Sequence, residues 1–147
     1  MTTQAVSERE TELRVKAHRV LPGGSFGNVP HEVVIREGRG GRVIDESGKE
    51  YVDFLLGSGP LLVGHAHPAV VAAVQAQMVR GSTFFMSNAA AIELAEQISG
   101  AVKCAEKVRY TSSGTEATHY AMRVARAYRR RDKIMKFEGG FHGMGDW

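Results

Sequence analysis

The sequence lacks the features that mark several classes of protein. It contains one cysteine, Cys104, so no internal disulfide framework can form. We interpret this thiol as a half-buried packing group between two predicted elements, rather than as a nucleophile. No apolar run reaches the roughly 18 residues that a membrane-spanning helix needs. The polar first residues lead into a charged stretch, which is unlike a secretory signal peptide. Together these absences favour a reducing, cytoplasmic setting.

An excess of charge of either sign is also missing. The 19 Lys and Arg residues against 16 Asp and Glu residues leave a net charge of +3, which does not indicate a nucleic acid or a membrane surface as partner. The composition, 43% hydrophobic and 24% charged, is that of a globular protein. Glycine is abundant, with 17 residues and no low-complexity segment, and this indicates many tight turns and close approaches of the backbone.

The first part of the chain predicts a helix followed by a small antiparallel meander. Ser7 and Glu10 have the spacing of a capping box, and apolar residues recur at helical intervals over residues 7–20. Glycine-containing turns at 40–41 and 47–48 separate three short β-prone runs. The strands are expected at residues 33–35, 42–45 and 49–54. Since so small a meander buries little surface, we expect it to pack on another part of the molecule.

Helices and strands alternate in the rest of the sequence. Helices are predicted over residues 68–80, from Asn88 to about residue 98 and over 114–130, and strands over 107–111 and 133–137. This alternation is typical of an α/β fold with a parallel sheet, although two strands are fewer than an open sheet usually has. We therefore predict an N-terminal segment, residues 1–56, and the beginning of an α/β domain with an incomplete parallel sheet, residues 57–147.

The sharpest motif lies at residues 111–117 (TSSGTEA), where a predicted strand leads into a helix. The first amides of a helix lack partners, and its N-terminus is electropositive. Hydroxyl side chains and a glycine at this point could form a cup for a phosphate group. The alternative is an ordinary helix cap, since Ser113 and Glu116 have capping-box spacing. The motif is neither a P-loop nor a dinucleotide-binding glycine fingerprint.

Three further stretches carry a functional and a structural interpretation each. Residues 137–143 (FEGGFHG) follow a predicted strand, where α/β proteins bind ligands, but a core Phe and a surface His would look the same. Residues 64–68 (GHAHP) contain a possible metal-binding pair, yet the following proline favours a structural turn. The arginines at positions 123, 126 and 129–131 could contact nucleic acid, but a solvated helix end explains them better.

Taken in order, five segments resemble one family. They are similar to the N-terminal part of a class-III pyridoxal-phosphate aminotransferase, in the branch near glutamate-1-semialdehyde aminomutase. The segments are residues 21–24 (LPGG), 45–54 (DESGKEYVDF), 59–68 (GPLLVGHAHP), 108–117 (VRYTSSGTEA) and 133–143 (KIMKFEGGFHG). The similarity covers most of residues 8–147. It implies the start of the large domain of a fold-type I pyridoxal-phosphate transferase after the helix and meander.

The resemblance also implies roles for individual residues. Ser113, Gly114 and Thr115 match the cup for the cofactor phosphate, Phe141 matches the aromatic residue on the pyridine ring, and His142 follows it near the ring. Ser58 and Gly59 would border the substrate pocket, and no metal is implied. The family forms homodimers and acts on an amine or amino acid with a keto or aldehyde acceptor.

Two departures separate the chain from the aminomutases that it resembles. An arginine that helps them hold substrate is absent from residues 27–30 (GNVP), and Ser58 replaces a usual tryptophan. We therefore expect an aminotransferase, with an aminomutase-like isomerase as the alternative.

The family's Schiff-base lysine lies beyond the segments that match. None of the six lysines of this chain corresponds to it, so we expect no catalytic residue within residues 1–147 and no activity of this chain alone. A second alternative is a non-catalytic chain that binds phosphate compounds or dimerises.

Overall fold

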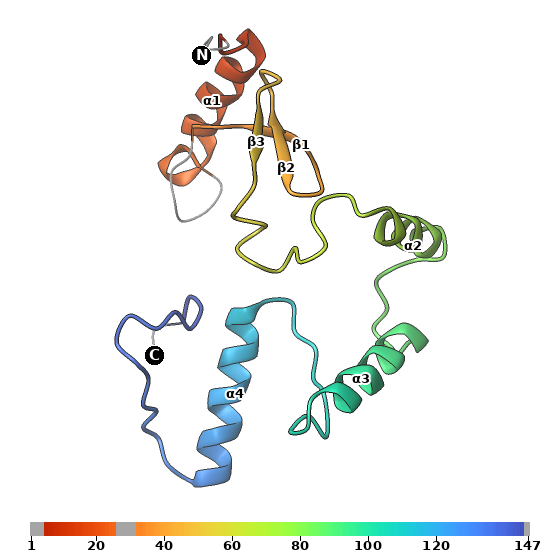
Figure 1. The fold of residues 1–147 in the computed structure, drawn as a ribbon. Coiled ribbons are helices and arrows are strands. Elements are labelled where there is room, and N and C mark those ends of the chain that lie inside the picture. Colours follow the sequence, from red (N-terminus) through yellow and green to blue (C-terminus); the bar gives the residue numbers. More distant parts are fainter. Residues whose placement is uncertain (1–4, 26–31, 146–147) are drawn as a thin grey trace. The chain divides into compact units, whose positions relative to one another are not determined.

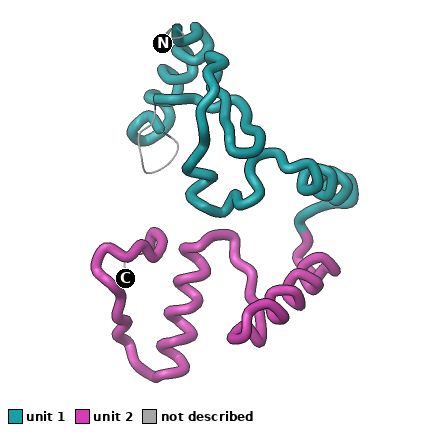
Figure 2. The backbone as a smooth tube through the Cα atoms, in the orientation of Figure 1, with its two compact units in different colours: residues 1–83 teal, residues 84–147 magenta. Residues whose placement is uncertain are grey.

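The structure is a computed structural model that describes residues 5–25 and 32–145. The elements, in chain order, are α1 (Glu8–Val20), a short 3-10 turn η1 (Pro22–Gly24), β1 (Ile35–Arg39), β2 (Arg42–Asp45), β3 (Glu50–Val52), α2 (Pro68–Met78), α3 (Ala89–Ala101) and α4 (Gly114–Arg129) (Figure 1). The chain forms two compact units, residues 1–83 and residues 84–147 (Figure 2). The expected domain boundary between residues 56 and 57 stays a prediction.

All four α-helices of the described residues begin where the sequence predicts, and three of them, α1, α3 and α4, begin with a side-chain cap. Ser7 accepts a hydrogen bond from the amide of Glu10 at 3.1 Å. Asn88 accepts one from the amide of Ala91 at 3.0 Å, and Ser113 caps α4 in the same way. Each cap satisfies an amide that has no partner within its helix. The predicted helices and their starting points are therefore confirmed.

The meander is present, with strand order β1-β2-β3 and antiparallel pairing throughout. Gly40 and Gly48 adopt positive φ angles of 54° and 83° in its two turns, as tight hairpin turns require. The first strand lies later than predicted, because it begins at Ile35 rather than ending there. A register shift between Ile35 and Glu37 interrupts the pairing of β1 with β2. Residues 33 and 34 precede the strand, and the carbonyl of Val34 accepts from the amide of Glu46 at 2.9 Å.

The two segments predicted as parallel strands, residues 107–111 and 133–137, are not strands in the structure. A strand exists only through hydrogen bonds to a neighbouring strand, and residues 84–145 contain no strand beside either segment. The fold class, mixed α/β with an N-terminal helix and a small sheet, is confirmed, and the sheet of the described residues is antiparallel. Cys104, expected to be half-buried, is exposed.

Burial is confined to polar groups. No apolar side chain is fully buried in residues 5–25 and 32–145, whereas Glu10 is 1% exposed and Asp45 is 3% exposed. Large apolar side chains of α2 and α3, among them Val74 and Leu94, remain about half exposed. In the same described residues, no helix combines the length and the apolar character needed to cross a bilayer.

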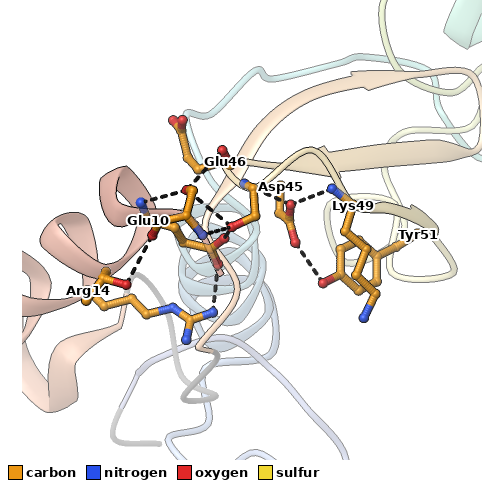
Figure 3. A network of polar contacts seen from close by, with 9 residues as sticks. Glu10, Arg14, Asp45, Glu46, Lys49 and Tyr51 are labelled. Atoms are coloured by element: carbon orange, nitrogen blue, oxygen red, sulfur yellow. Dashed lines mark hydrogen bonds and ion pairs between the residues drawn. The ribbon is translucent and has the colours of Figure 1, made fainter. Parts of the chain in front are cut away.

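A polar clasp joins α1 to the turn between β2 and β3 (Figure 3). We define it as Ser7, Glu10, Asp45, Ser47 and Tyr51. The amide of Ser7 donates to the hydroxyl oxygen of Ser47 at 2.8 Å, and the Ser47 hydroxyl donates to the carboxylate of Glu10. Since buried charges are tolerated only when they are paired and hydrogen-bonded, these contacts explain how a glutamate can be buried at this point.

Both carboxylates of the clasp are held in their ionised form. Arg14 donates to Glu10 Oε1 at 2.7 Å, and the Tyr51 hydroxyl donates to Asp45 Oδ2 at 2.8 Å. The hydrogen bond from Ser47 is the main cause of a lowered pKa at Glu10, against the opposing effect of burial. Burial is the largest influence on Asp45, but hydrogen bonds from Tyr51 and from two backbone amides outweigh it and lower that pKa as well.

The clasp predicts a loss of stability at both ends of the pH scale. The carboxyls have lower pKa values in the folded state, so their contribution is lost as pH falls below the ordinary values of 4.5 for Glu10 and 3.8 for Asp45. The pKa of Tyr51 is raised above 10.0, chiefly by its hydrogen bond to Asp45, so its contribution is lost as pH rises through the raised value. Urea midpoints measured across pH should fall at both ends.

The tyrosine provides a matched control for this pH profile. Tyr51→Phe should abolish the alkaline decline and leave an acid decline in place. An alkaline decline of unchanged size in Tyr51→Phe would contradict the assignment.

Candidate functional site

The first turn of α4 is the element on which the predicted phosphate cup rests. The Ser113 hydroxyl oxygen accepts from the amide of Glu116 at 3.2 Å, and the Glu116 carboxylate accepts from the amide of Ser112 at 2.7 Å. These two amides are therefore occupied. The amides of Gly114 and Thr115 have no partner within the helix, because they belong to its first turn. A Cβ at Gly114 would meet nothing within 4 Å, so the space beside the Cα of this residue is open.

Hydroxyl protons of the same turn remain available for a ligand. Ser113 uses its oxygen as an acceptor, and Thr115 Oγ1 accepts from the amide of Met144 at 3.0 Å. A hydroxyl that accepts a hydrogen bond can still donate its own proton. Two hydroxyl donors, two amides and the positive end of a helix are what a phosphate group requires.

The structure brings this turn together with the loop that carries the other predicted cofactor residues. We call residues 139–145 the aromatic loop. The Thr118 hydroxyl donates to the carbonyl of His142 at 2.9 Å, and the bond from Met144 to Thr115 lies beside it. Ser113, Gly114, Thr115, Phe141 and His142 therefore belong to one local arrangement in the second unit.

The two ring-bearing residues of the aromatic loop differ in their surroundings. Phe141 is 84% exposed, so the faces of its ring are accessible. His142 is partly buried, and its Nε2 lies 2.8 Å from the ammonium group of Lys136. Because an ammonium can only donate, the contact assigns the imidazole proton to Nδ1. That Nδ1 is buried and has no hydrogen-bond partner in the part of the chain that the structure describes.

The predicted substrate residues, Ser58 and Gly59, lie in the first unit, in the loop between β3 and α2. Gly57, Ser58 and Gly59 have φ angles of 64°, 66° and 104° in succession. A serine in the left-handed region is uncommon, and such strain is concentrated at functional sites. The role of Ser58 and Gly59 stays a prediction, and the aminomutase-type arginine position, residues 27–30, lies outside the described residues.

The His-x-His motif takes part in a structural turn. The backbone of His65 pairs with that of Gly40, and its Nε2 lies 2.7 Å from Asp53 Oδ2. The hydrogen bond to His65 is the main cause of a lowered pKa at Asp53. Gly64 has a φ of 77°, and a Cβ there would lie 2.7 Å from the carbonyl oxygen of Gly40. In the part of the chain that the structure describes, no cluster of three His, Cys, Asp or Glu residues could hold a metal.

Comparison with known families identifies the chain. Residues 25–146 match the model of the class-III aminotransferases. The chain belongs to this family. This class-III chain is 47% identical over 143 residues to glutamate-1-semialdehyde 2,1-aminomutase of Methanothermobacter thermautotrophicus, an alignment that covers 95% of the chain and 34% of the aminomutase.

Solved structures agree with the family assignment. A transaminase with pyridoxal phosphate bound is 41% identical, with a TM-score of 0.89 over 97% of this class-III chain and 34% of the transaminase. An omega-transaminase from Sphaerobacter thermophilus is 38% identical, with a TM-score of 0.87 over 93% of this chain and 32% of its own. The chain spans about a third of the length of the curated relatives that it matches.

Two residues of the site, Thr118 and Met144, lie outside the motifs of this class-III sequence, and both contact predicted residues. Lys136 lies within the segment 133–143, but its contact with His142 was not predicted. Thr118 lies 24 residues before His142 and has the position of an ordinary helix residue. No pattern in a single sequence signals a contact of this kind.

Proposed function

We propose that this chain is the N-terminal part of a pyridoxal-phosphate-dependent aminotransferase that moves an amino group between an amine or amino acid and a keto or aldehyde acceptor. The observation that carries the proposal is the first turn of α4, which holds donors for a phosphate next to the aromatic loop, in a chain of the class-III family.

The residues present fit the cofactor at its phosphate. Ser113 and Thr115 each retain a hydroxyl proton, and Gly114 leaves the helix N-terminus open. A phosphate dianion in this position would receive charge-assisted hydrogen bonds from the hydroxyls and from the two amides that lack helical partners.

The residues also fit the cofactor at its ring. The exposed ring of Phe141 suits stacking on a planar pyridine, and the buried Nδ1 of His142 has no partner among residues 5–25 and 32–145. When bound, pyridoxal phosphate supplies an electron sink for the carbanion formed at the substrate carbon. This chain would hold the phosphate, orient the ring through Phe141 and His142, and keep a proton on His142 Nδ1.

An aminomutase is the second candidate function. It is favoured by the curated relatives, of which several at 41–47% identity are named glutamate-1-semialdehyde 2,1-aminomutase. The substrate separates the two proposals, since an aminomutase would isomerise glutamate-1-semialdehyde without a second amino acceptor. The strained Ser58–Gly59 segment would border the substrate in either case, and a homodimer is proposed from the family resemblance.

The phosphate cup predicts selective loss of affinity for the phosphorylated cofactor. Ser113→Ala removes one hydrogen bond to a charged group, of about 1.5–3 kcal/mol, so the Kd for pyridoxal phosphate should rise by roughly 10- to 100-fold. Binding of pyridoxal, which lacks the phosphate, should change little. Absorbance titrations of the full-length protein with both compounds measure the difference.

Asn88→Ala is the matched control, because Asn88 caps α3 as Ser113 caps α4. Both changes remove a helix cap, at a cost of about 1 kcal/mol in stability, but only Ser113 belongs to the cup. Equal affinities of the unchanged protein for pyridoxal and pyridoxal phosphate would contradict the proposal, as would an equal loss in both variants.

A further inference from the structure

Two hydrogen bonds connect the aromatic loop to α4, and no sequence motif predicts either of them. One is the hydrogen bond from the Thr118 hydroxyl to the carbonyl of His142, 2.9 Å. The other is the hydrogen bond from the amide of Met144 to Thr115 Oγ1, 3.0 Å. The two bonds involve the loop backbone on either side of Gly143. Their partners, Thr115 and Thr118, lie one turn apart on α4. Two threonine side chains of α4 thereby hold the backbone of the loop.

Gly143 shows how close this approach is. A Cβ at this position would lie 2.7 Å from Thr115 Oγ1 and 2.8 Å from Thr115 Cα, and its φ of 93° is one that side-chain-bearing residues rarely adopt. The loop backbone can therefore reach the helix only because residue 143 is glycine.

The Thr118 hydroxyl has a choice of acceptors. It lies 3.1 Å from the carbonyl oxygen of Gly114, 3.0 Å from that of Thr115 and 2.9 Å from that of His142. The first two carbonyls belong to its own helix, and bonds of this kind are common for helical threonines and hold nothing else in place. The bond to His142 spans 24 residues and is the contact that fixes the loop.

We propose that Thr118 is a positioning residue, which holds the backbone of His142 so that Phe141 and the His142 ring keep a fixed place beside the first turn of α4. Thr118 itself need not touch a ligand. This role rests on the proposed function. The position of Phe141 and His142 relative to the first turn of α4 matters only if both sites bind the same cofactor, one its ring and the other its phosphate. Thr115 extends the connection, since its oxygen accepts from Met144 while its proton is free for the phosphate.

Amide hydrogen exchange without any cofactor tests the contact itself. In the full-length protein, Thr118→Val removes the hydroxyl and keeps the branched shape, so the amide of Met144, which donates to Thr115 Oγ1, should exchange about fivefold faster. Thr118→Ser keeps the hydroxyl and should restore the original rate. Thr11→Val is the matched control, because Thr11 also donates to a helical carbonyl, that of Ser7, but lies in the first unit.

Unchanged exchange at the Met144 amide in Thr118→Val would overturn the proposal, as would equal acceleration by the Ser and Val variants. If the valine variant fails to fold, Thr118→Ala replaces it, since alanine is the best helix former and also lacks the hydroxyl. Faster exchange in the alanine variant supports the proposal, and an unchanged rate overturns it.

Cofactor binding then separates the role of Thr118 from that of the phosphate cup. In Thr118→Val, the aromatic loop should occupy its position against α4 for a smaller fraction of the time. The Kd values for pyridoxal and for pyridoxal phosphate should therefore rise by the same factor, up to about fivefold. Affinities equal to those of the unchanged protein would overturn the positioning role. If the unchanged protein binds neither compound while the exchange rates respond as expected, the contact stands and the proposed function fails.

Discussion

Replacing Glu10 by alanine should lower the free energy of unfolding by about 2–3 kcal/mol. The carboxylate of Glu10 is 1% exposed and receives hydrogen bonds from Ser47 and Arg14. Alanine would remove the carboxylate to which the Ser47 hydroxyl donates and would leave the Arg14 guanidinium without its ion-pair partner. Arg14 is 30% exposed and regains some hydration, which keeps the loss below that of a fully buried pair. Urea unfolding of the full-length protein measures the change.

Glu12 on the same helix is the matched control for this prediction. Its carboxylate lies 3.8 Å from Arg9, and both side chains are more than half exposed. Surface pairs of this kind contribute little, so Glu12→Ala should change the free energy of unfolding by about 0.5 kcal/mol or less. Losses of similar size in the two variants would show that the clasp does not stabilise the protein.

Residues 1–147 expressed by themselves should have no aminotransferase activity. The family depends on a Schiff-base lysine, and none of the six lysines of this chain matches that position in the resemblance. The expected loss is therefore the whole catalytic enhancement, on the order of a million-fold or more. Addition of pyridoxal phosphate followed by borohydride should give no adduct that is specific to one lysine, as mass spectrometry of the digested chain would report.

Lys136 provides the most demanding check on this prediction. Its ammonium group lies 2.8 Å from His142 Nε2, so it is the lysine next to the candidate ring site. A single adduct at Lys136 that disappears in Lys136→Arg would contradict the expectation. A chimaera provides the positive control: residues 1–147 replace the matching third of the Methanothermobacter thermautotrophicus aminomutase and should support activity, because the remaining two thirds come from the relative.

What the sequence predicts well in this chain is local. The caps at Ser7, Asn88 and Ser113 are confirmed because a cap depends on residues within one turn of each other. The motif of residues 111–117 was located by the same local chemistry, and the structure places a capped helix there. The family resemblance was likewise carried by short segments in order, and the family match confirms it.

What the sequence did not predict depends on distant partners. Residues 107–111 and 133–137 have the composition of strands, but composition cannot supply the neighbouring strand that pairing requires. Glu10 was expected to complete a capping box, whereas its carboxylate bonds Ser47, 37 residues away. The contact between Thr118 and His142 spans 24 residues and was missed for the same reason.

The polar clasp also bears on the order in which the protein acquires its structure. All of its members lie between Ser7 and Tyr51, so none of its hydrogen bonds depends on α2, α3 or α4. At about 5–20 residues per second, a ribosome makes this stretch within roughly ten seconds. Helix α1 can therefore be anchored to the meander before the exposed apolar helices that follow have left the exit tunnel. The polar clasp of the nascent chain can then form first, and the exposed apolar surfaces of the later helices emerge afterwards.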